Sequence, residues 1–128
     1  EEENQNASIE QVNYWRQRPQ SAPTLLVVSC YPNKEKLHKV PMVEQILSVG
    51  ALCQNILNGA YALGFYSQWI TEWPAYNYKV KNLLGHDSDI NLIGFIFIGS
   101  TLITPVERKR AEISDVVSKW RGTGVNTQ

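Results

Sequence analysis

One predicted helix, Val43–Leu63, constrains the fold of this chain more than any other segment. At 100° per residue Glu44, Ser48, Asn55 and Asn58 fall within one narrow arc, and almost every other position is apolar. A helix with so little polar surface must be covered on most sides, and a chain of 128 residues has limited material for that. The helix could be covered by a second chain or by its own domain, and the small size of the chain favours a second chain.

Short apolar runs on either side of this helix predict strands. Thr24–Tyr31 is rich in apolar residues and bounded by prolines, and the aromatic run Phe65–Trp69 follows Gly64, the expected left-handed residue after the helix. Leu92–Gly99 is apolar throughout, which is typical of a strand at the centre of a sheet covered on both faces.

Smaller helices are expected around these strands. Ser8 can cap a helix that continues to about Gln17. Pro74–Leu84 suits a second helix, with its proline in the first turn. Ser114–Trp120 predicts a short terminal helix or an extended arm. We therefore expect an α+β fold, an α/β sandwich in which helices flank a central mixed sheet.

The length predicts one domain, 23–121, preceded by an acidic segment with a short helix, 1–22, and followed by a flexible tail, 122–128. Lysine plus arginine equals aspartate plus glutamate at 12 each, so no basic field exists to attract nucleic acid. No apolar run reaches the length of about 20 residues that crosses a bilayer, and the N-terminus does not read as a signal peptide. A cytoplasmic protein is expected. Cys30 and Cys53 are interpreted as buried free thiols rather than a disulfide.

Motifs that carry chemistry by themselves are scarce. The residues His86, Asp87 and Asp89 are interpreted as a turn rather than a metal site, so no metal is expected, and no catalytic residue is predicted. Aromatic side chains concentrate between 66 and 78, where they could form core packing or a wall for a planar ligand: Tyr66, Trp69, Trp73, Tyr76 and Tyr78. Arg108 and Arg110 could bind a phosphate or could simply lie on a solvated turn.

Several short motifs together resemble the small one-domain nitroreductases, which are FMN-dependent oxidoreductases that use NADH or NADPH. They are Ala22-Pro23, Val40-Pro41, Glu44-Gln45, Asn55, Ala62-Leu63-Gly64, Trp69 with Thr71, Leu92-Ile93-Gly94-Phe95, Gly99, Pro105-x-Glu107-Arg108-x-Arg110, and Asp115-Val116-Val117 with Trp120. The resemblance implies a homodimeric flavoprotein that passes hydride equivalents from NAD(P)H through FMN to a small electrophilic acceptor such as a nitro compound. It also implies that the dimer buries the long helix.

The resemblance also implies a set of cofactor-binding residues. Trp69, Ile70, Thr71 and Glu72 would flank the flavin ring, and Arg108 and Arg110 would help to hold the FMN phosphate. The family often has glycine where this chain has Glu72. The arginine-rich motif with which the family begins is absent from this sequence. The alternative is therefore a non-catalytic remnant or fragment of a nitroreductase that binds no flavin and serves as a dimerising or interaction domain.

Overall fold

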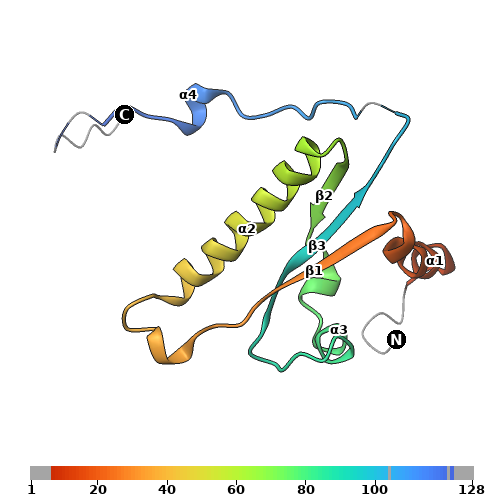
Figure 1. Cartoon of the computed structure of the whole chain (residues 1–128), viewed down its shortest axis with the longest axis horizontal. Helices are drawn as coiled ribbons and strands as arrows, with labels where there is room; N and C mark the ends of the chain where they lie inside the picture. Colours follow the sequence, from red (N-terminus) through yellow and green to blue (C-terminus); the bar gives the residue numbers. More distant parts are fainter. Residues whose placement is uncertain (1–6, 104, 121, 123–128) are drawn as a thin grey trace.

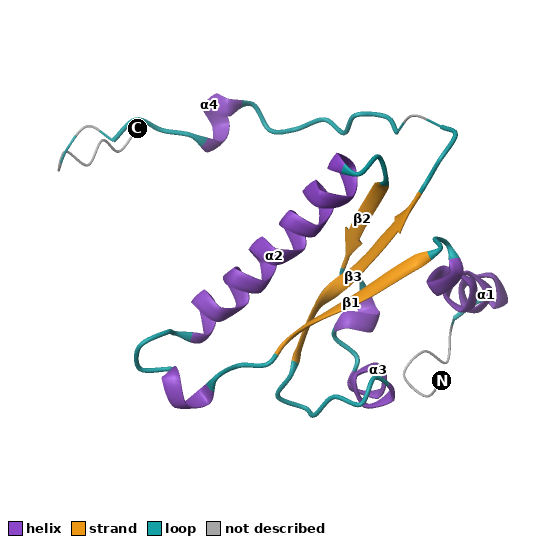
Figure 2. Ribbon diagram, viewed as in Figure 1, coloured by secondary structure: helices purple, strands orange, loops and turns teal. Residues whose placement is uncertain are grey.

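The computed structural model describes residues 7–103, 105–120 and 122, and it contains four α-helices and three strands (Figures 1 and 2). In chain order these are α1 (Ile9–Gln17), β1 (Thr24–Cys30), α2 (Met42–Ala62), β2 (Tyr66–Ile70), α3 (Tyr78–Leu83), β3 (Asn91–Gly99) and α4 (Ile113–Val116). Short 3₁₀ turns cover Arg18–Gln20, Lys34–Lys36 and Trp73–Ala75.

The strands form one sheet in the order β1-β3-β2, and β3 is antiparallel to both neighbours. The predicted α+β class is confirmed. The expected mixed sheet is wrong for the residues described, because β3 lies between β1 and β2. Those two strands run in the same direction but do not pair with each other. The central place predicted for the apolar run that became β3 is confirmed.

The pairing register sorts side chains onto two faces of the sheet, because residues directly opposite each other share a face. Ile96 lies between Leu26 and Trp69 on the face that α2 covers. Phe95 lies between Val27 and Ile70 on the opposite face, where α1 and α3 are found (Figure 2). The sheet therefore has one face that packs on the long helix and another that faces the smaller helices.

A small core holds α2 against the sheet. Val28, Cys53 and Ile96 are buried at its centre, and further side chains pack around them: Val49, Ile56, Leu57, Trp69, Ile93 and Ile98. Burying one such aliphatic side chain contributes about 1.5–3 kcal/mol. Both cysteines are buried free thiols, as predicted. Burial raises the pKa of the Cys53 thiol, so at neutral pH it stays protonated and unreactive.

Helix α2 begins after Pro41 and ends as predicted, with Gly64 in the left-handed region at φ 83°. The amide of Gly64 donates to the carbonyl of Tyr61 (3.0 Å), and the amide of Phe65 donates to that of Ala60 (2.9 Å). This pair of bonds is the Schellman arrangement, which satisfies carbonyls that the helix end would leave free. Leu47, on the side of the helix away from the sheet, is 65% exposed. Within the described chain, then, α2 is covered on one side.

Helix α1 starts as predicted at Ser8, through a reciprocal capping box. The amide of Gln11 donates to Ser8 Oγ at 3.2 Å, and the amide of Ser8 donates to Gln11 Oε1 at 2.9 Å. The expected helix over Pro74–Leu84 is shorter than predicted. Its first residues form a 3₁₀ turn, and the α-helix begins only after Asn77, whose side-chain oxygen accepts hydrogen bonds from the amides of Lys79 and Val80.

Beyond β3 the chain leaves the sheet as an arm, residues 101–120 apart from 104, that includes α4 and runs past the end of α2 (Figure 1). Large apolar side chains on this arm are exposed, among them Leu102, Val106 and Trp120. A short helix or an extended arm was predicted for Ser114–Trp120. The structure has both, since α4 ends at Val116 and Val117 after it is extended. The flexible tail predicted for 122–128 lies outside the described residues, apart from Gly122. Of the helices described, none has the length and apolar character needed to cross a membrane.

Candidate functional site

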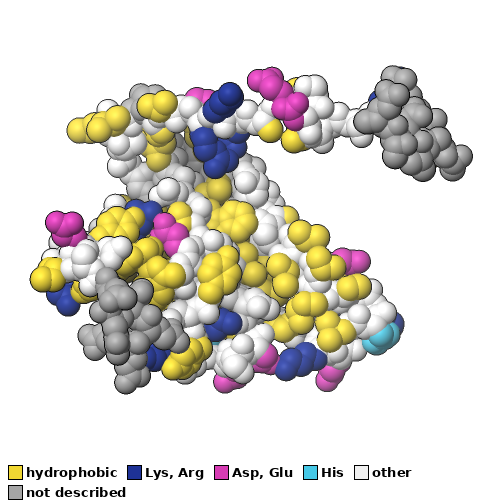
Figure 3. Space-filling model, turned by 180° about the vertical axis from the view of Figure 1, so that it is seen from behind, with side chains coloured by type: hydrophobic (Ala, Val, Ile, Leu, Met, Phe, Trp, Pro, Cys, Tyr) yellow, Lys and Arg dark blue, Asp and Glu magenta, His cyan; other side chains and the backbone are white. Residues whose placement is uncertain are grey.

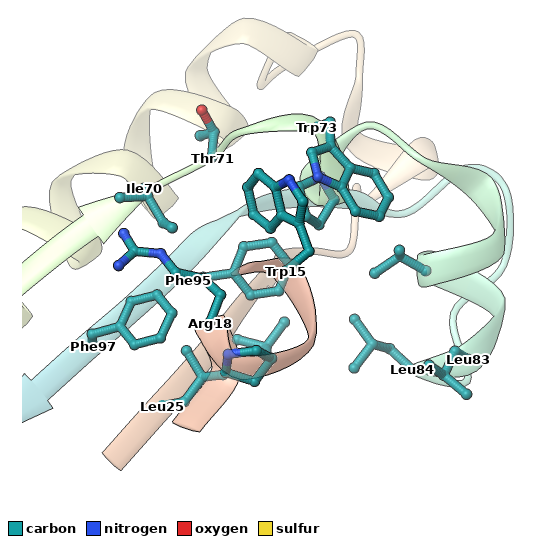
Figure 4. Close-up of a pocket in the computed structure, with 14 residues that line it drawn as sticks. Trp15, Arg18, Leu25, Ile70, Thr71, Trp73, Leu83, Leu84, Phe95 and Phe97 are labelled. Carbon is teal, nitrogen blue, oxygen red and sulfur yellow. The ribbon is translucent and has the colours of Figure 1, made fainter. Parts of the chain in front are cut away.

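A pocket of about 300 Å³ lies on the face of the sheet opposite α2 (Figure 4). Its walls come from α1 and the turn after it, all three strands, and the segment from Thr71 through α3. The lining residues are Trp15, Arg18, Pro19, Leu25, Val27, Ile70, Thr71, Trp73, Pro74, Val80, Leu83, Leu84, Phe95 and Phe97. The volume is at the lower end of the range of about 300–1,000 Å³ that is usual for small-molecule sites.

Cross-strand register explains the floor of the pocket. Phe95 and Phe97 are two residues apart on β3 and therefore point to the same face. Leu25 lies beside Phe97 and Val27 beside Phe95 on β1, while Ile70 flanks Phe95 on β2. The result is a continuous apolar floor made of aromatic and branched side chains.

Two tryptophans join the pocket's rim across a long stretch of sequence. The ring of Trp15 on α1 meets that of Trp73 edge to face, with centroids 5.4 Å apart and planes at 82°. This geometry is favourable for aromatic pairs and contributes about 0.5–1.5 kcal/mol beyond area burial. No residue of α1 is buried. The helix is tied to the rest of the chain by this ring contact and by the hydrogen bond from Arg18, the residue that follows it, to Gln68 on β2.

Arg18 is the one charged residue of the pocket lining. Its guanidinium carbon lies 5.1 Å from the centre of the Phe97 ring and 5.8 Å from that of Tyr14. Its Nη2 donates to Gln68 Oε1 at 3.3 Å. Its Nε is buried and has no hydrogen-bond partner among the described residues. Figure 4 shows the guanidinium between Phe97 and Ile70. A cation with an unsatisfied buried donor is thus placed against an apolar wall.

The predicted flavin-flanking segment, Trp69–Glu72, is divided by the fold. Trp69 points to the α2 face, where its Nε1 donates to the carbonyl of Ile93 at 3.1 Å. Ile70 and Thr71 line the pocket on the other face. Glu72 is exposed, with φ 49° and ψ −175°, and it is the one non-glycine residue with positive φ in the part of the chain that the structure describes. That backbone region is essentially one for glycine, so Glu72 carries strain of about 1–3 kcal/mol.

The structure does not bring the predicted phosphate-binding pair to this pocket. Arg108 and Arg110 are exposed on the arm, and Arg110 Nε is 3.4 Å from Glu107 Oε1. Exposed pairs of this kind contribute at most about 1 kcal/mol. Figure 3, which views the molecule from behind, shows the arm extending beyond the body, with basic side chains partway along it.

The local cluster at 86–89 is a turn, as predicted. His86 bridges two residues of the β1 end, with Nε2 2.8 Å from Ser29 Oγ and Nδ1 2.8 Å from the hydroxyl of Tyr31. Asp89 forms an ion pair with Lys34. The described residues contain no group of three potential ligands that could hold a metal ion.

Sequence reasoning missed most of the pocket. Of the aromatic residues between 66 and 78, only Trp73 lines it. Among the lining residues missed were Trp15, Arg18, Phe95 and Phe97, and two signals in the sequence pointed to these four. The alternation of Phe95 and Phe97 in β3 places both rings on one face, and Trp15 and Arg18 are three residues apart at the end of a helix.

This architecture is similar to that of known proteins. The model of the nitroreductase family matches residues 1–100. A nitroreductase-like family protein from Bacillus cereus has a similar structure, with a TM-score of 0.72 and 19% identity over 93% of this chain and 64% of that one. A nitroreductase family protein from Streptococcus pneumoniae TIGR4 gives a TM-score of 0.54 and 16% identity, over 89% of this chain and 51% of that one. This chain thus spans less than two thirds of either structure. No curated protein sequence matches it.

Proposed function

The chain belongs to the nitroreductase family of oxidoreductases, and from that premise we propose that it works as a flavoprotein. It would pass hydride equivalents from NAD(P)H through FMN to a small electrophilic acceptor such as a nitro compound. The observation that carries the proposal is the position of Ile70 and Thr71. These residues, expected to flank the flavin, line an aromatic pocket at the end of β2.

The residues at the end of β2 fit the ring portion of FMN. The positive φ of Glu72 turns the backbone sharply after Thr71, in a conformation that suits the glycine often found at this place in the family. Thr71 adds a hydroxyl that can donate or accept a hydrogen bond. The exposed carboxylate of Glu72 is screened by solvent, so it does not exclude a reduced, anionic ring nearby.

The phosphate portion of FMN fits less directly, because Arg108 and Arg110 lie on the arm rather than at the pocket. In the proposal, these arginines reach the cofactor in a homodimer. The arm exposes apolar side chains and α2 exposes the side that faces away from the sheet, so both surfaces are available to a second copy. Docking of the arm would bring its arginines against the body of the assembly, where guanidinium groups bind phosphate oxygens well.

In this proposal the chemistry belongs to the cofactor. When bound, FMN would supply the hydride-transfer chemistry, so no acid–base pair of the chain is required. The residues of the chain would bind and orient the cofactor. Ile70 and Thr71 would form the contact surface for the ring, the backbone at Glu72 would supply hydrogen-bonding groups to its edge, and Arg108 with Arg110 would hold the phosphate.

A visible absorption spectrum of the purified chain, taken before and after adding FMN and desalting, tests the proposal. We expect retained flavin bands, which NADH or NADPH should bleach under anaerobic conditions. Arg108→Ala should weaken FMN binding about tenfold, as loss of a charge-assisted contact does. The matched control is Lys109→Ala, which removes a charge from the same exposed run.

The second candidate is a dimerising nitroreductase-like domain that binds no flavin. It is favoured by one observation: within one chain, no described residue of the arm lines the pocket. A dimeric protein that stays colourless after FMN treatment would establish this candidate in place of the first. Equal FMN affinity in Arg108→Ala and Lys109→Ala would remove Arg108 from the site.

A further inference from the structure

The pocket contains a positive charge with no acid to balance it. Among the described residues no carboxylate pairs with Arg18, although its guanidinium lies over the Phe97 ring and its Nε is buried. Gln68 satisfies one of its donors and the buried Nε has none. A buried donor without a partner is destabilising. An anionic group bound at the guanidinium would recover that cost and neutralise the charge.

The rest of the lining specifies what the anion must be attached to. Around Arg18 the walls are rings and branched aliphatic side chains, and the floor is formed by Phe95 and Phe97. Flat aromatic groups gain from offset or edge contacts with such rings. Thr71 lies on the far side of the pocket from the N-terminal helix, and Figure 4 shows its hydroxyl directed away from the rings. The volume of about 300 Å³ is at the lower end of the range for small-molecule sites, which favours a small ligand.

We propose that this pocket binds a small aromatic carboxylate, with its ring over Phe95 and its carboxylate on the guanidinium of Arg18, which itself lies over Phe97. A carboxylate matches the fork of donors that arginine presents. The two tryptophans at the rim, Trp15 and Trp73, close over the ring. Because Nε is buried, a two-point contact through Nε and an Nη atom requires a small rotation of the Arg18 side chain.

This binding site is inferred from the pocket alone and does not depend on the proposed function. Its relation to the flavin rests on the proposed function. Ile70 and Thr71, which we propose to contact the flavin ring, also line this pocket, so an aromatic carboxylate bound here would compete with that ring.

Isothermal titration calorimetry on the whole chain, without added flavin, tests the site directly. The probes are 4-nitrobenzoate and the neutral 4-nitrobenzamide, which have nearly the same size and shape. We expect the carboxylate to bind at least about tenfold more tightly, as expected for a charge-assisted contact. In Arg18→Met this preference should fall to within about twofold, whereas Arg16→Met, an exposed arginine of α1, should keep it.

A second variant covers the case in which Arg18→Met does not fold. Val27→Trp fills the pocket from β1 and leaves Arg18 in place, so it should abolish binding of both probes. Equal affinity of the wild type for the two probes, or no binding of either, would overturn the site. So would a preference that survives in Arg18→Met. Because no step of this test involves flavin, it can succeed when FMN binding fails, and the reverse.

Discussion

The indole of Trp69 lies directly across the backbone of Gly94. A β-carbon added at Gly94 would be 2.1 Å from Trp69 Nε1 and 2.7 Å from the carbonyl oxygen of Ile70. The same nitrogen donates to the carbonyl of Ile93, so the ring is fixed over the neighbouring strand at this point. Gly94 also has φ 155°, a conformation that residues with a side chain rarely adopt.

We expect Gly94→Ala to lower the free energy of unfolding by more than about 2 kcal/mol, because the new methyl group must displace the ring or separate the strands. Gly59→Ala is the matched control. Nothing lies within 4 Å of an added β-carbon at Gly59, so the helix should gain about 0.5–1 kcal/mol. Urea unfolding followed by tryptophan fluorescence measures both. A neutral effect of Gly94→Ala would show that Trp69 is free to move.

Glu72 is held in a backbone conformation that glycine adopts without strain. Glu72→Gly should therefore raise the free energy of unfolding by about 1 kcal/mol, which is the relief of strain less the entropy cost of glycine. Thr71→Gly, at the adjacent residue, should lower it. Thermal melts of the two variants and the wild type give the comparison. A loss of stability in Glu72→Gly would mean that the side chain contributes more than the strain costs.

The exposed side of α2 leads to a prediction about assembly. If a second copy covers it, Leu47→Glu should convert a dimer to a monomer, because a buried carboxylate without a partner is strongly disfavoured. The monomer should stay folded, since Leu47 is 65% exposed within one chain. Ile9→Glu, at an exposed position on α1, is the control and should leave the dimer intact. Light scattering after size exclusion measures the mass. A wild-type chain that is monomeric at all concentrations would contradict the proposed dimer.

The ion pair between Lys34 and Asp89 makes a pH-dependent contribution. The hydrogen bond from Lys34 lowers the pKa of Asp89 below its usual value of about 3.9. The stabilisation is therefore present above that usual value and is lost as the pH falls through the lowered pKa of the folded state. Asp89→Asn should give a slightly lower melting temperature than the wild type at pH 7, and the difference should vanish in acid, once the carboxyl of Asp89 is protonated in the folded state as well.

The effect is expected to be small because both side chains are largely exposed to solvent. Asp87→Asn, in the same turn, is the control and should show no such crossover. A difference between Asp89→Asn and the wild type that persists at pH 2 would have to come from a cause other than ionisation.

Local signals in the sequence were enough to predict much of this fold. Ser8 and Gly64 marked helix ends correctly, because a hydrogen-bonding side chain or a left-handed residue is required there whatever surrounds it. Pro74 misled, because proline suits a 3₁₀ turn as well as the start of an α-helix, and the cap at Asn77 is the stronger signal.

The site was harder to predict, since it depends on the face to which each side chain points. Trp69 and Ile70 are adjacent in sequence and lie on opposite faces of the sheet. The contribution of Arg18 depends on a helix crossing to the sheet near Gln68, fifty residues later, and no local pattern records that contact.

The strand order has a consequence for how the chain folds as the ribosome makes it. The middle strand of the sheet, β3, is the last of the three to be synthesised, so neither β1 nor β2 has a pairing partner until residue 91 and beyond have emerged. Until then α2 has no complete sheet to pack on and its apolar side is open to other molecules. A growing chain of this kind is prone to aggregate late in synthesis, because the sheet can form only after its central strand, β3, has been made.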